Sequence, residues 1–182
     1  MRFRETSISG LVIVEPERLE DARGFFARTF DPHDFAAHGL DPAVAETSVA
    51  FNAVALTLRG LHHQVAPYEE SKLVRCTRGS VFDVVVDLRP ASPTHLRWEA
   101  VELTAENRLT LHVPKGCAHG YLTLEDETEL AYQISQPHVP DAGAGVRWDD
   151  PLVGIEWPAV PRVMSERDAS FPDLPPIVSA PS

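Results

Sequence analysis

The chain of 182 residues carries 27 acidic and 16 basic side chains, which gives a formal net charge of −11 and a pI near 5.1. This acid excess argues against a nucleic-acid-binding groove, because such domains are usually basic. No apolar run approaches the roughly 18 residues of a membrane helix. Only two cysteines occur and no charged-then-apolar leader opens the chain, which predicts a reducing, cytoplasmic location. We expect one domain over residues 1–182, because a chain of this length can bury about 70% of its unfolded surface.

Short segments rich in valine, leucine, threonine and aromatic residues are separated by sixteen prolines and ten glycines, which is typical of all-β proteins. In chain order, strands are predicted at 8–14, 56–64, 72–77, 80–88, 97–103, 109–113, 118–124 and 128–135. A turn at Arg78 and Gly79 joins two of these strands into a hairpin. Antiparallel strands at this density predict a sandwich or a barrel.

Helix signals are weak in this chain. Asp31 as a cap and Pro32 in the first turn predict one short helix after Phe30. After Pro137 the alternation fades and Pro, Asp, Gly and Trp become frequent, which predicts a tail packed across the barrel. Residues 172–182 are predicted to be frayed.

Three side chains on two neighbouring predicted strands form a candidate catalytic set. Arg59 can hold a phosphate or a carboxylate, His62 can take a proton near neutral pH, and Lys72 can stabilise an oxyanion. A lone strand histidine is more often a satisfied core residue, and it is the neighbouring cations that favour function here. A base of this kind also needs an orienting carboxylate, which spacing cannot choose from 27 acids.

Two further positions have a structural and a functional interpretation. Leu130, Tyr132 and Ile134 share a strand face, so Tyr132 is a core tyrosine, or a general acid if that face lines the interior. In the segment DARGFF around Arg23, Gly24 marks a bulge or turn and Phe25 or Phe26 could stack on a ring, or the segment is simply an ordinary strand opening.

Eight histidines invite a metal hypothesis, which the spacing disfavours. His62 and His63 are adjacent and would face opposite sides of a strand, so they cannot easily bind one ion. His119, in PKGCAHG, could serve as a third ligand, but the His-x-His pair expected in a metal-binding barrel is missing. Because Lys72 also brings positive charge nearby, we predict neither metal nor cofactor.

The ordered segments DARGFF, LRGLHHQ, SKLVRC, GSVFDVVVDLR, VPKGCAHGYLTLED, AYQIS, VRWDDP, IEWP and SERD resemble the dTDP-4-dehydrorhamnose 3,5-epimerase family from about residue 8 to residue 174. The resemblance implies an all-β, cupin-type jelly-roll barrel with a few short helices. It also implies a homodimer that works without metal on a nucleotide-linked 4-keto-6-deoxy hexose, through an enolate that is reprotonated on the opposite face.

Residue roles follow from the resemblance, position by position. His62 matches the family's base and Asp168 the carboxylate that orients it. Lys72 matches the lysine that meets the substrate, and we assign it the developing charge on O4. Tyr132 matches the general acid across the pocket from His62.

The binding positions carry over less evenly. Arg23 and Arg59 match cations that grip the diphosphate, His119 matches a pocket histidine, and Phe26 fits a ring contact to the nucleoside across the dimer interface. Departures from the family pattern gather at the nucleotide end, at Arg28, Glu46, Ser48, His138, Gly143 and Arg167. The nucleobase is therefore left open.

Several activities remain compatible with these residues. One is epimerisation at C3 and C5, and another is epimerisation at a single carbon. A ketoisomerase is disfavoured by the complete set of His62, Tyr132 and Asp168. From other classes, a non-catalytic sugar-nucleotide-binding cupin would keep the arginines without turnover, and a metal-dependent oxygenase would bind iron. The pathway served, surface rhamnose or a natural-product deoxysugar, also stays open.

Overall fold

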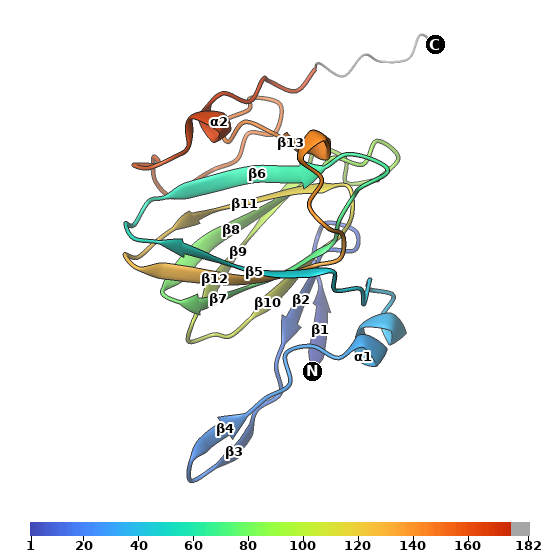
Figure 1. The fold of residues 1–182 in the computed structure, drawn as a ribbon, viewed down its shortest axis with the longest axis vertical. Helices are drawn as coiled ribbons and strands as arrows, with labels where there is room; N and C mark the ends of the chain where they lie inside the picture. Colours follow the sequence, from blue (N-terminus) through green and yellow to red (C-terminus); the bar gives the residue numbers. More distant parts are fainter. Residues whose placement is uncertain (176–182) are drawn as a thin grey trace.

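Two antiparallel sheets make up the body of the protein in the computed structural model, which describes residues 1–175 (Figure 1). The first sheet has the strand order β1 (Arg2–Glu5), β2 (Val12–Glu15), β10 (Thr110–Val113), β7 (Lys72–Arg78), β12 (Thr128–Ile134) and β5 (Glu46–Asn52). The second has the order β13 (Gly143–Gly145), β6 (Leu58–Gln64), β11 (Cys117–Thr123), β8 (Ser80–Asp87) and β9 (Trp98–Thr104). The sheets face each other, as expected for a jelly roll.

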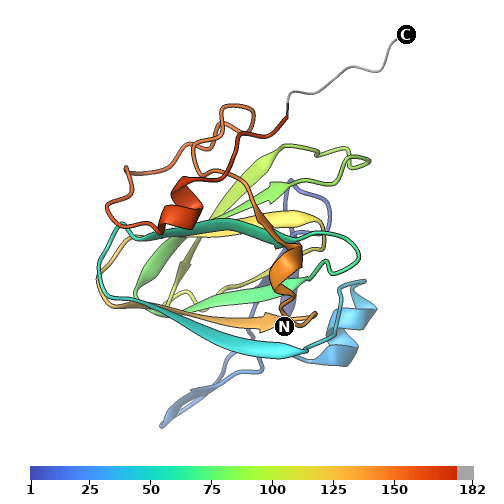
Figure 2. The same ribbon diagram turned by 45° about the horizontal axis from the view of Figure 1, so that its top comes forward.

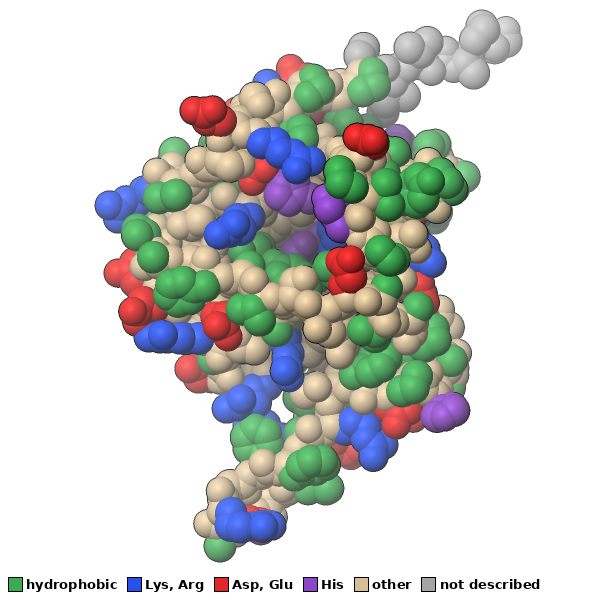
Figure 3. All heavy atoms as spheres, in the orientation of Figure 1, with side chains coloured by type: hydrophobic (Ala, Val, Ile, Leu, Met, Phe, Trp, Pro, Cys, Tyr) green, Lys and Arg blue, Asp and Glu red, His purple; other side chains and the backbone are tan. Residues whose placement is uncertain are grey.

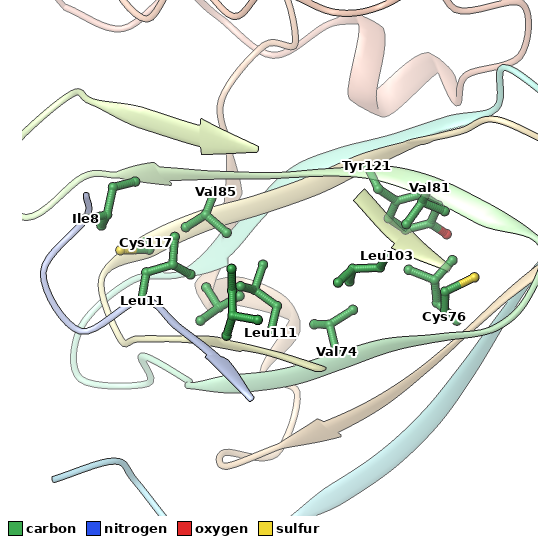
Figure 4. Packing of buried hydrophobic residues seen from close by; sticks show 13 residues of the cluster. Ile8, Leu11, Val74, Cys76, Val81, Val85, Leu103, Leu111, Cys117 and Tyr121 are labelled. Carbon is green, nitrogen blue, oxygen red and sulfur yellow. The ribbon is translucent and has the colours of Figure 1, made fainter. Parts of the chain in front are cut away.

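The core lies between the two sheets and follows the period-two alternation of the strands. Val74 and Leu111 come from the first sheet, and Val81, Val85 and Tyr121 come from the second (Figure 4). All five are 2% exposed or less. Burying such a side chain contributes about 1.5–3 kcal/mol, so this layer holds the barrel closed.

Residues 146–175, the covering segment, lie over the outer face of the second sheet (Figure 2). Val84 and Val86 point to this side of β8 and pack with Val146, Val153 and other residues of the covering segment. The short 3₁₀ helix η1 (Pro140–Ala142) precedes the segment, and the short helix α2 (Glu166–Ala169) lies within it. The predicted packing of the tail across the barrel is therefore confirmed.

One short helix, α1 (Pro32–Ala37), lies where the sequence predicts it. The Asp31 carboxylate accepts hydrogen bonds from the backbone of His33 and Asp34 at 3.0 and 3.3 Å, which caps the first turn. Phe35 is 1% exposed and packs with Leu73 on the outer face of the first sheet. The helix thus covers part of that face.

A two-stranded hairpin projects away from the body (Figure 1). Its strands are β3 (Leu19–Asp21) and β4 (Gly24–Phe26), with Asp21 opposite Gly24. Leu19 is 67% exposed and Phe26 is 69% exposed. In the isolated chain both of these large apolar side chains are therefore largely exposed to solvent.

Strand boundaries are where prediction and structure differ. The predicted strand at 8–14 begins only at Val12, because Ile8 and Leu11 close a turn with a 3.1 Å backbone hydrogen bond and Gly10 adopts a φ of 79°. The sequence analysis also missed several short or half-exposed strands, namely β1, β3, β5 and β13, and the helix α2. Of the predicted frayed tail at 172–182, residues 176–182 lie outside the described part, and the backbone of Leu174 donates to Asp150 Oδ2 at 2.6 Å.

Candidate active site

A cavity of about 660 Å³ opens between the two sheets on the side where β5 and β6 meet the covering segment. The space-filling view shows the surface hollowed, with histidine side chains inside (Figure 3). Its lining residues are Ser48, Ala50, Thr57, Leu58, Arg59, His62, Lys72, His119, Tyr121, Tyr132, Ile134, Val163, Met164, Ser165, Arg167 and Asp168. The predicted set of His62, Lys72, Tyr132 and Asp168 therefore lies around one space.

Strand register brings these side chains together. His62 on β6 lies opposite His119 on β11, and Ile134 on β12 lies opposite Lys72 on β7. Tyr132, two residues before Ile134, shares its face of β12. The alternation seen in the sequence therefore predicts the correct face for Tyr132.

His62 and Asp168 form the closest polar pair in the cavity wall. Nε2 of His62 lies 2.7 Å from Oδ1 of Asp168, and Oδ2 of the same carboxylate accepts the backbone N–H of Gly60 at 3.1 Å. Asp168 sits in α2, where its own N–H donates to Oγ of Ser165 at 3.0 Å. One carboxylate thus ties the imidazole and its strand to the covering segment.

The charge of this carboxylate is supported by its partners. Burial alone would raise the pKa of Asp168, but hydrogen bonds from His62, Gly60 and Ser165 and the charge of His62 hold that pKa below its ordinary value. An ionised Asp168 fixes the imidazole through Nε2. Nδ1 is therefore the ring nitrogen left to exchange a proton with a ligand.

Lys72 is held at the cavity wall by two acceptors. Its Nζ lies 3.0 Å from Oε1 of Glu70 and 3.0 Å from the backbone oxygen of His62. Glu70 is 7% exposed, and its Oε2 accepts the backbone N–H of Gln64 at 3.0 Å. An ammonium has three N–H donors, so one remains for a ligand.

Tyr132 stands across from the histidines with its hydroxyl protonated. Its ring meets that of His119 edge-on, with 6.1 Å between centroids. Burial, together with Tyr121 and Asp83, raises the pKa of Tyr132 well above its ordinary value. His119 is itself held by Asp83, at 2.9 and 3.0 Å from Nε2. The phenol can therefore act as a proton donor at neutral pH.

Arg59 marks the cavity end nearest the edge strand β5. Its Nε donates to Oδ1 of Asn52 at 2.8 Å, and a terminal nitrogen donates to the backbone oxygen of Phe51 at 3.3 Å. The same Asn52 oxygen accepts the Tyr121 hydroxyl at 3.3 Å. A guanidinium oriented in this way can meet an anionic group of a ligand.

A recess of about 210 Å³ adjoins the cavity and shares His62, Lys72, Ile134 and Arg167 with it. Four positions that depart from the family pattern line it: Glu46, His138, Gly143 and Arg167. Oε1 of Glu46 accepts the backbone N–H of His138 at 3.2 Å. The recess thus continues the cavity toward β13.

The structure of the single chain does not bring Arg23, Phe26 and Arg28 to this cavity. Arg23 is on the projecting hairpin, where it pairs with Asp21 at 2.6 Å. Arg28 pairs with Asp31 at 2.9 Å at the start of α1. These three predicted binding residues lie apart from the cavity of their own chain.

Several residues of the cavity wall were not predicted from the sequence. Tyr121 lies two residues after His119 on one strand face, so alternation could have revealed it. Ser165 caps α2 three residues before Asp168, a spacing typical of helix N-termini that could have marked it. Glu70, which pairs with Lys72, lines the adjoining recess and belongs to no motif. Within residues 1–175, no three His, Cys, Asp or Glu side chains are placed to hold a metal ion, and no helix there is long and apolar enough to cross a membrane.

The fold and the cavity together fit the class of enzymes that move a proton next to a carbonyl. The jelly roll places an imidazole–carboxylate pair, an ammonium and a phenol around one cavity. These are the groups needed to remove a proton beside a carbonyl and to return it.

Comparison with known proteins identifies the family. The profile of the dTDP-4-dehydrorhamnose 3,5-epimerase family matches residues 5–175. A dTDP-4-dehydrorhamnose 3,5-epimerase of Sinorhizobium fredii is 40% identical over 175 residues, which cover 96% of this chain and 90% of that protein. The chain therefore belongs to the dTDP-4-dehydrorhamnose 3,5-epimerase family, and the predicted family and epimerase class are confirmed.

Two solved structures share the fold. The Bacillus anthracis dTDP-4-dehydrorhamnose 3,5-epimerase with TDP and pyrophosphate bound has a TM-score of 0.91 at 35% identity, covering 95% of this chain and 99% of that one. A 3′-monoepimerase from Streptomyces bikiniensis in complex with dTDP-quinovose has a TM-score of 0.85 at 35% identity, covering 92% and 85%. The predicted all-β jelly-roll fold is confirmed.

Proposed function

We propose that this chain epimerises C3, C5 or both in a nucleotide-linked, most simply dTDP-linked, 4-keto-6-deoxy hexose. The 4-keto group acidifies the hydrogens on C3 and C5. A base removes one of them to give an enolate, and a proton delivered to the opposite face inverts the centre. Proton removed and proton returned balance, so the reaction needs no redox partner.

The pair of His62 and Asp168 is the observation that carries this proposal. His62 is 40% exposed at its side chain and borders the cavity, while Asp168 behind it is 6% exposed. A carboxylate 2.7 Å from Nε2 orients the ring and stabilises the imidazolium that forms when Nδ1 takes the proton. His62 is thus the base and Asp168 its orienting group.

Lys72 and Tyr132 complete the reaction. The remaining N–H of Lys72 meets O4 as negative charge develops there, and a preorganised donor of this kind contributes on the order of 3 kcal/mol. Tyr132, whose raised pKa keeps the phenol protonated, delivers the proton from the side opposite His62. How far the sugar ring can rotate between His62 and Tyr132 then decides which carbons can be inverted.

The remaining cavity residues bind the nucleotide part in this proposal. Arg59 and Arg167 supply cations for the diphosphate, Ser48 faces the nucleotide end, and His119 contacts the sugar, since all four line the cavity. Glu46 and His138 lie in the adjoining recess, where they would meet the nucleoside. The Bacillus anthracis relative with TDP and pyrophosphate bound supports a nucleoside diphosphate as part of the ligand.

We also propose that the chain works as a homodimer in the cytoplasm. The hairpin with Arg23 and Phe26 extends beyond its own barrel, and a second copy would let it reach the neighbouring cavity. On the edge strand β5, Val49 is 64% exposed and Phe51 is 48% exposed. Such an uncovered apolar edge favours pairing. Cys76 and Cys117 are both unpaired and buried, in keeping with a reducing compartment.

Epimerisation at a single carbon is the second candidate. The structural similarity to a 3′-monoepimerase supports it, because the same cavity residues could serve one carbon or two. The two candidates differ in how many carbons are inverted in the product. A ketoisomerase would instead give a sugar with its carbonyl at C3, and a non-catalytic binding protein would exchange no proton.

Deuterium wash-in tests the proposal. The wild-type protein in D₂O, given 4-keto-6-deoxy hexoses linked to dTDP and to other nucleoside diphosphates, is expected to incorporate deuterium at C3, C5 or both and to yield the inverted sugar. Exchange with inversion at only one carbon would select the monoepimerase, whereas a product with its carbonyl moved to C3 would select the ketoisomerase. Binding without exchange at either carbon would refute the epimerase proposal and favour a sugar-nucleotide-binding cupin.

A further inference from the structure

The proposed pair of His62 and Asp168 depends on a part of the chain that belongs to neither sheet. Asp168 lies in α2, a helix of four residues, 106 positions after His62. A helix of one turn has little stability of its own. Something outside α2 must therefore fix the position of Asp168 relative to His62.

The chain before α2 is tied to the barrel by backbone contacts. Thr57 and Val163 form an isolated parallel bridge, and the N–H of Leu58 donates to the oxygen of Val163 at 2.9 Å. Beyond α2, Asp173 pairs with Arg147 at 2.8 Å, and the N–H of Leu174 donates to Asp150 at 2.6 Å. These anchors fix the ends of the segment, and between them the Gly60 N–H holds the Asp168 carboxylate of α2 at 3.1 Å but does not restrain the His62 ring.

Phe171 lies next to α2 and packs where Gly145 has no side chain. A Cβ on Gly145 would lie 2.3 Å from Cε2 and Cζ of the Phe171 ring, far inside contact distance. Gly145 lies in strand β13 without a left-handed φ, so its backbone does not require glycine. The glycine is needed for space, and Phe171 uses that space.

The Phe171 ring lies against both the His62 ring and the Arg167 side chain of α2. Gly145 lies opposite His62 in the pairing of β13 with β6. The Phe171 ring meets the His62 ring edge-on, with 6.0 Å between centroids and 70° between planes. The guanidinium of Arg167 lies over Phe171 at 5.8 Å. One half-buried aromatic side chain therefore contacts the imidazole and the helix that carries its carboxylate.

Resting on the function proposed above, we propose that Phe171, seated on Gly145, is a positioning residue that holds His62 and α2 in register. The ring restricts the rotation of the imidazole from its edge, while Asp168 holds Nε2. Phe171 touches neither the substrate nor the reacting atoms in this account. Its effect on catalysis passes through His62 and Asp168.

Gly145→Ala is the first test, because the added methyl must displace the Phe171 ring. We expect kcat to fall about 100-fold, the loss that a shift of roughly 1 Å in catalytic groups produces. The Kd for dTDP is expected to rise by no more than about fivefold, because only the cation–π contact of Arg167 links this ring to the diphosphate. Val160→Ala, at a 76% exposed position of the same segment, is the matched control and should keep wild-type kcat.

A second-site variant distinguishes positioning from general damage. Leucine lacks the Cε and Cζ atoms that an alanine at 145 would strike, so Gly145→Ala combined with Phe171→Leu should recover at least about tenfold in kcat over Gly145→Ala. Phe171→Leu alone creates no overlap and is expected to lower kcat about tenfold, while the Kd for dTDP rises by no more than about fivefold through the lost contact with Arg167. This single variant decides the question if Gly145→Ala fails to fold.

Each outcome bears on the proposal. Wild-type kcat in Phe171→Leu, or no recovery in a folded double variant that still binds dTDP, would overturn the positioning role. If the wild-type protein itself catalyses no exchange, the epimerase proposal fails instead, so the two failures are distinct.

Discussion

His62 and Lys72 lie on strands with a paired neighbour on each side, whereas Arg23 and Phe26 lie on a hairpin that projects from the body. The first pair is held by hydrogen bonds of 2.7 to 3.0 Å to other side chains and backbone, and the second is largely exposed. The proton-transfer end of the cavity is thus built by the fold of one chain. The nucleotide end depends on exposed elements, and this makes the reaction easier to infer than the substrate.

If the proton-transfer end carries the chemistry, His62→Ala should have the largest effect. Loss of the base is expected to lower turnover by about 10⁴-fold, the upper end for a general base. Product formation measured by NMR checks this. His33→Ala, at an exposed position of α1, is the control and should be silent. A less than tenfold loss in His62→Ala would contradict the assignment of the base.

Lys72→Met should follow in magnitude. Removing the donor to O4 is expected to lower kcat by about 10²–10³-fold, as loss of one oxyanion donor does. Lys115→Met provides the matched control, because Lys115 pairs with Asp41 away from the cavity. Equal losses in both variants would show that the effect comes from net charge rather than from position.

Tyr132→Phe should separate exchange from inversion. Without the phenol, His62 can still remove and return a proton on its own face, so exchange should stay within about tenfold of wild type while inversion falls about 100-fold. Comparing deuterium content with product stereochemistry in one reaction measures both. Inversion at the wild-type rate would refute the general-acid role.

At the nucleotide end the expected effects are smaller and of a different kind. Phe26→Ala should raise KM by about 2–10-fold with little change in kcat, since an aromatic contact contributes about 0.5–1.5 kcal/mol. The matched control is Leu19→Ala on the facing strand of the hairpin. A loss confined to kcat would place Phe26 with the chemistry and remove the contrast between the two ends.

The smallest expected effect is on stability as a function of pH. Because the folded pKa of Asp168 lies below its ordinary value, its stabilising contribution is present above about pH 4 and is lost as pH falls through the folded pKa. The difference in free energy of unfolding between wild type and Asp168→Asn should therefore shrink between pH 7 and pH 3. Urea titrations at several pH values measure this difference in free energy of unfolding. A difference that grows toward low pH would contradict the lowered pKa of Asp168.

Local patterns predicted the centre of the fold well. Alternation groups Tyr132 and Ile134 on one strand face, which the structure turns toward the cavity, and the Asp31 cap marks α1. These features depend on residues near one another in the chain. Strand β5 was missed because most of its residues are exposed and its sequence shows little contrast between faces.

Contacts between distant segments could not be predicted from spacing. The family resemblance named Asp168 as the partner of His62, whereas no pattern in the residues themselves pointed to it. The hydrogen bond from the Gly60 N–H to Asp168 and the seat of Phe171 on Gly145 appear only once the chain is folded. These contacts join strand ends and a covering segment, whose positions local propensity does not determine.

The decisive measurement is proton exchange from C3 and C5 in D₂O, with wild type and His62→Ala compared on the same dTDP-linked 4-keto-6-deoxy hexose. We expect deuterium at one or both carbons with the wild-type protein and none above background with His62→Ala at equal dTDP binding. Exchange by His62→Ala at the wild-type rate would rule out His62 as the base.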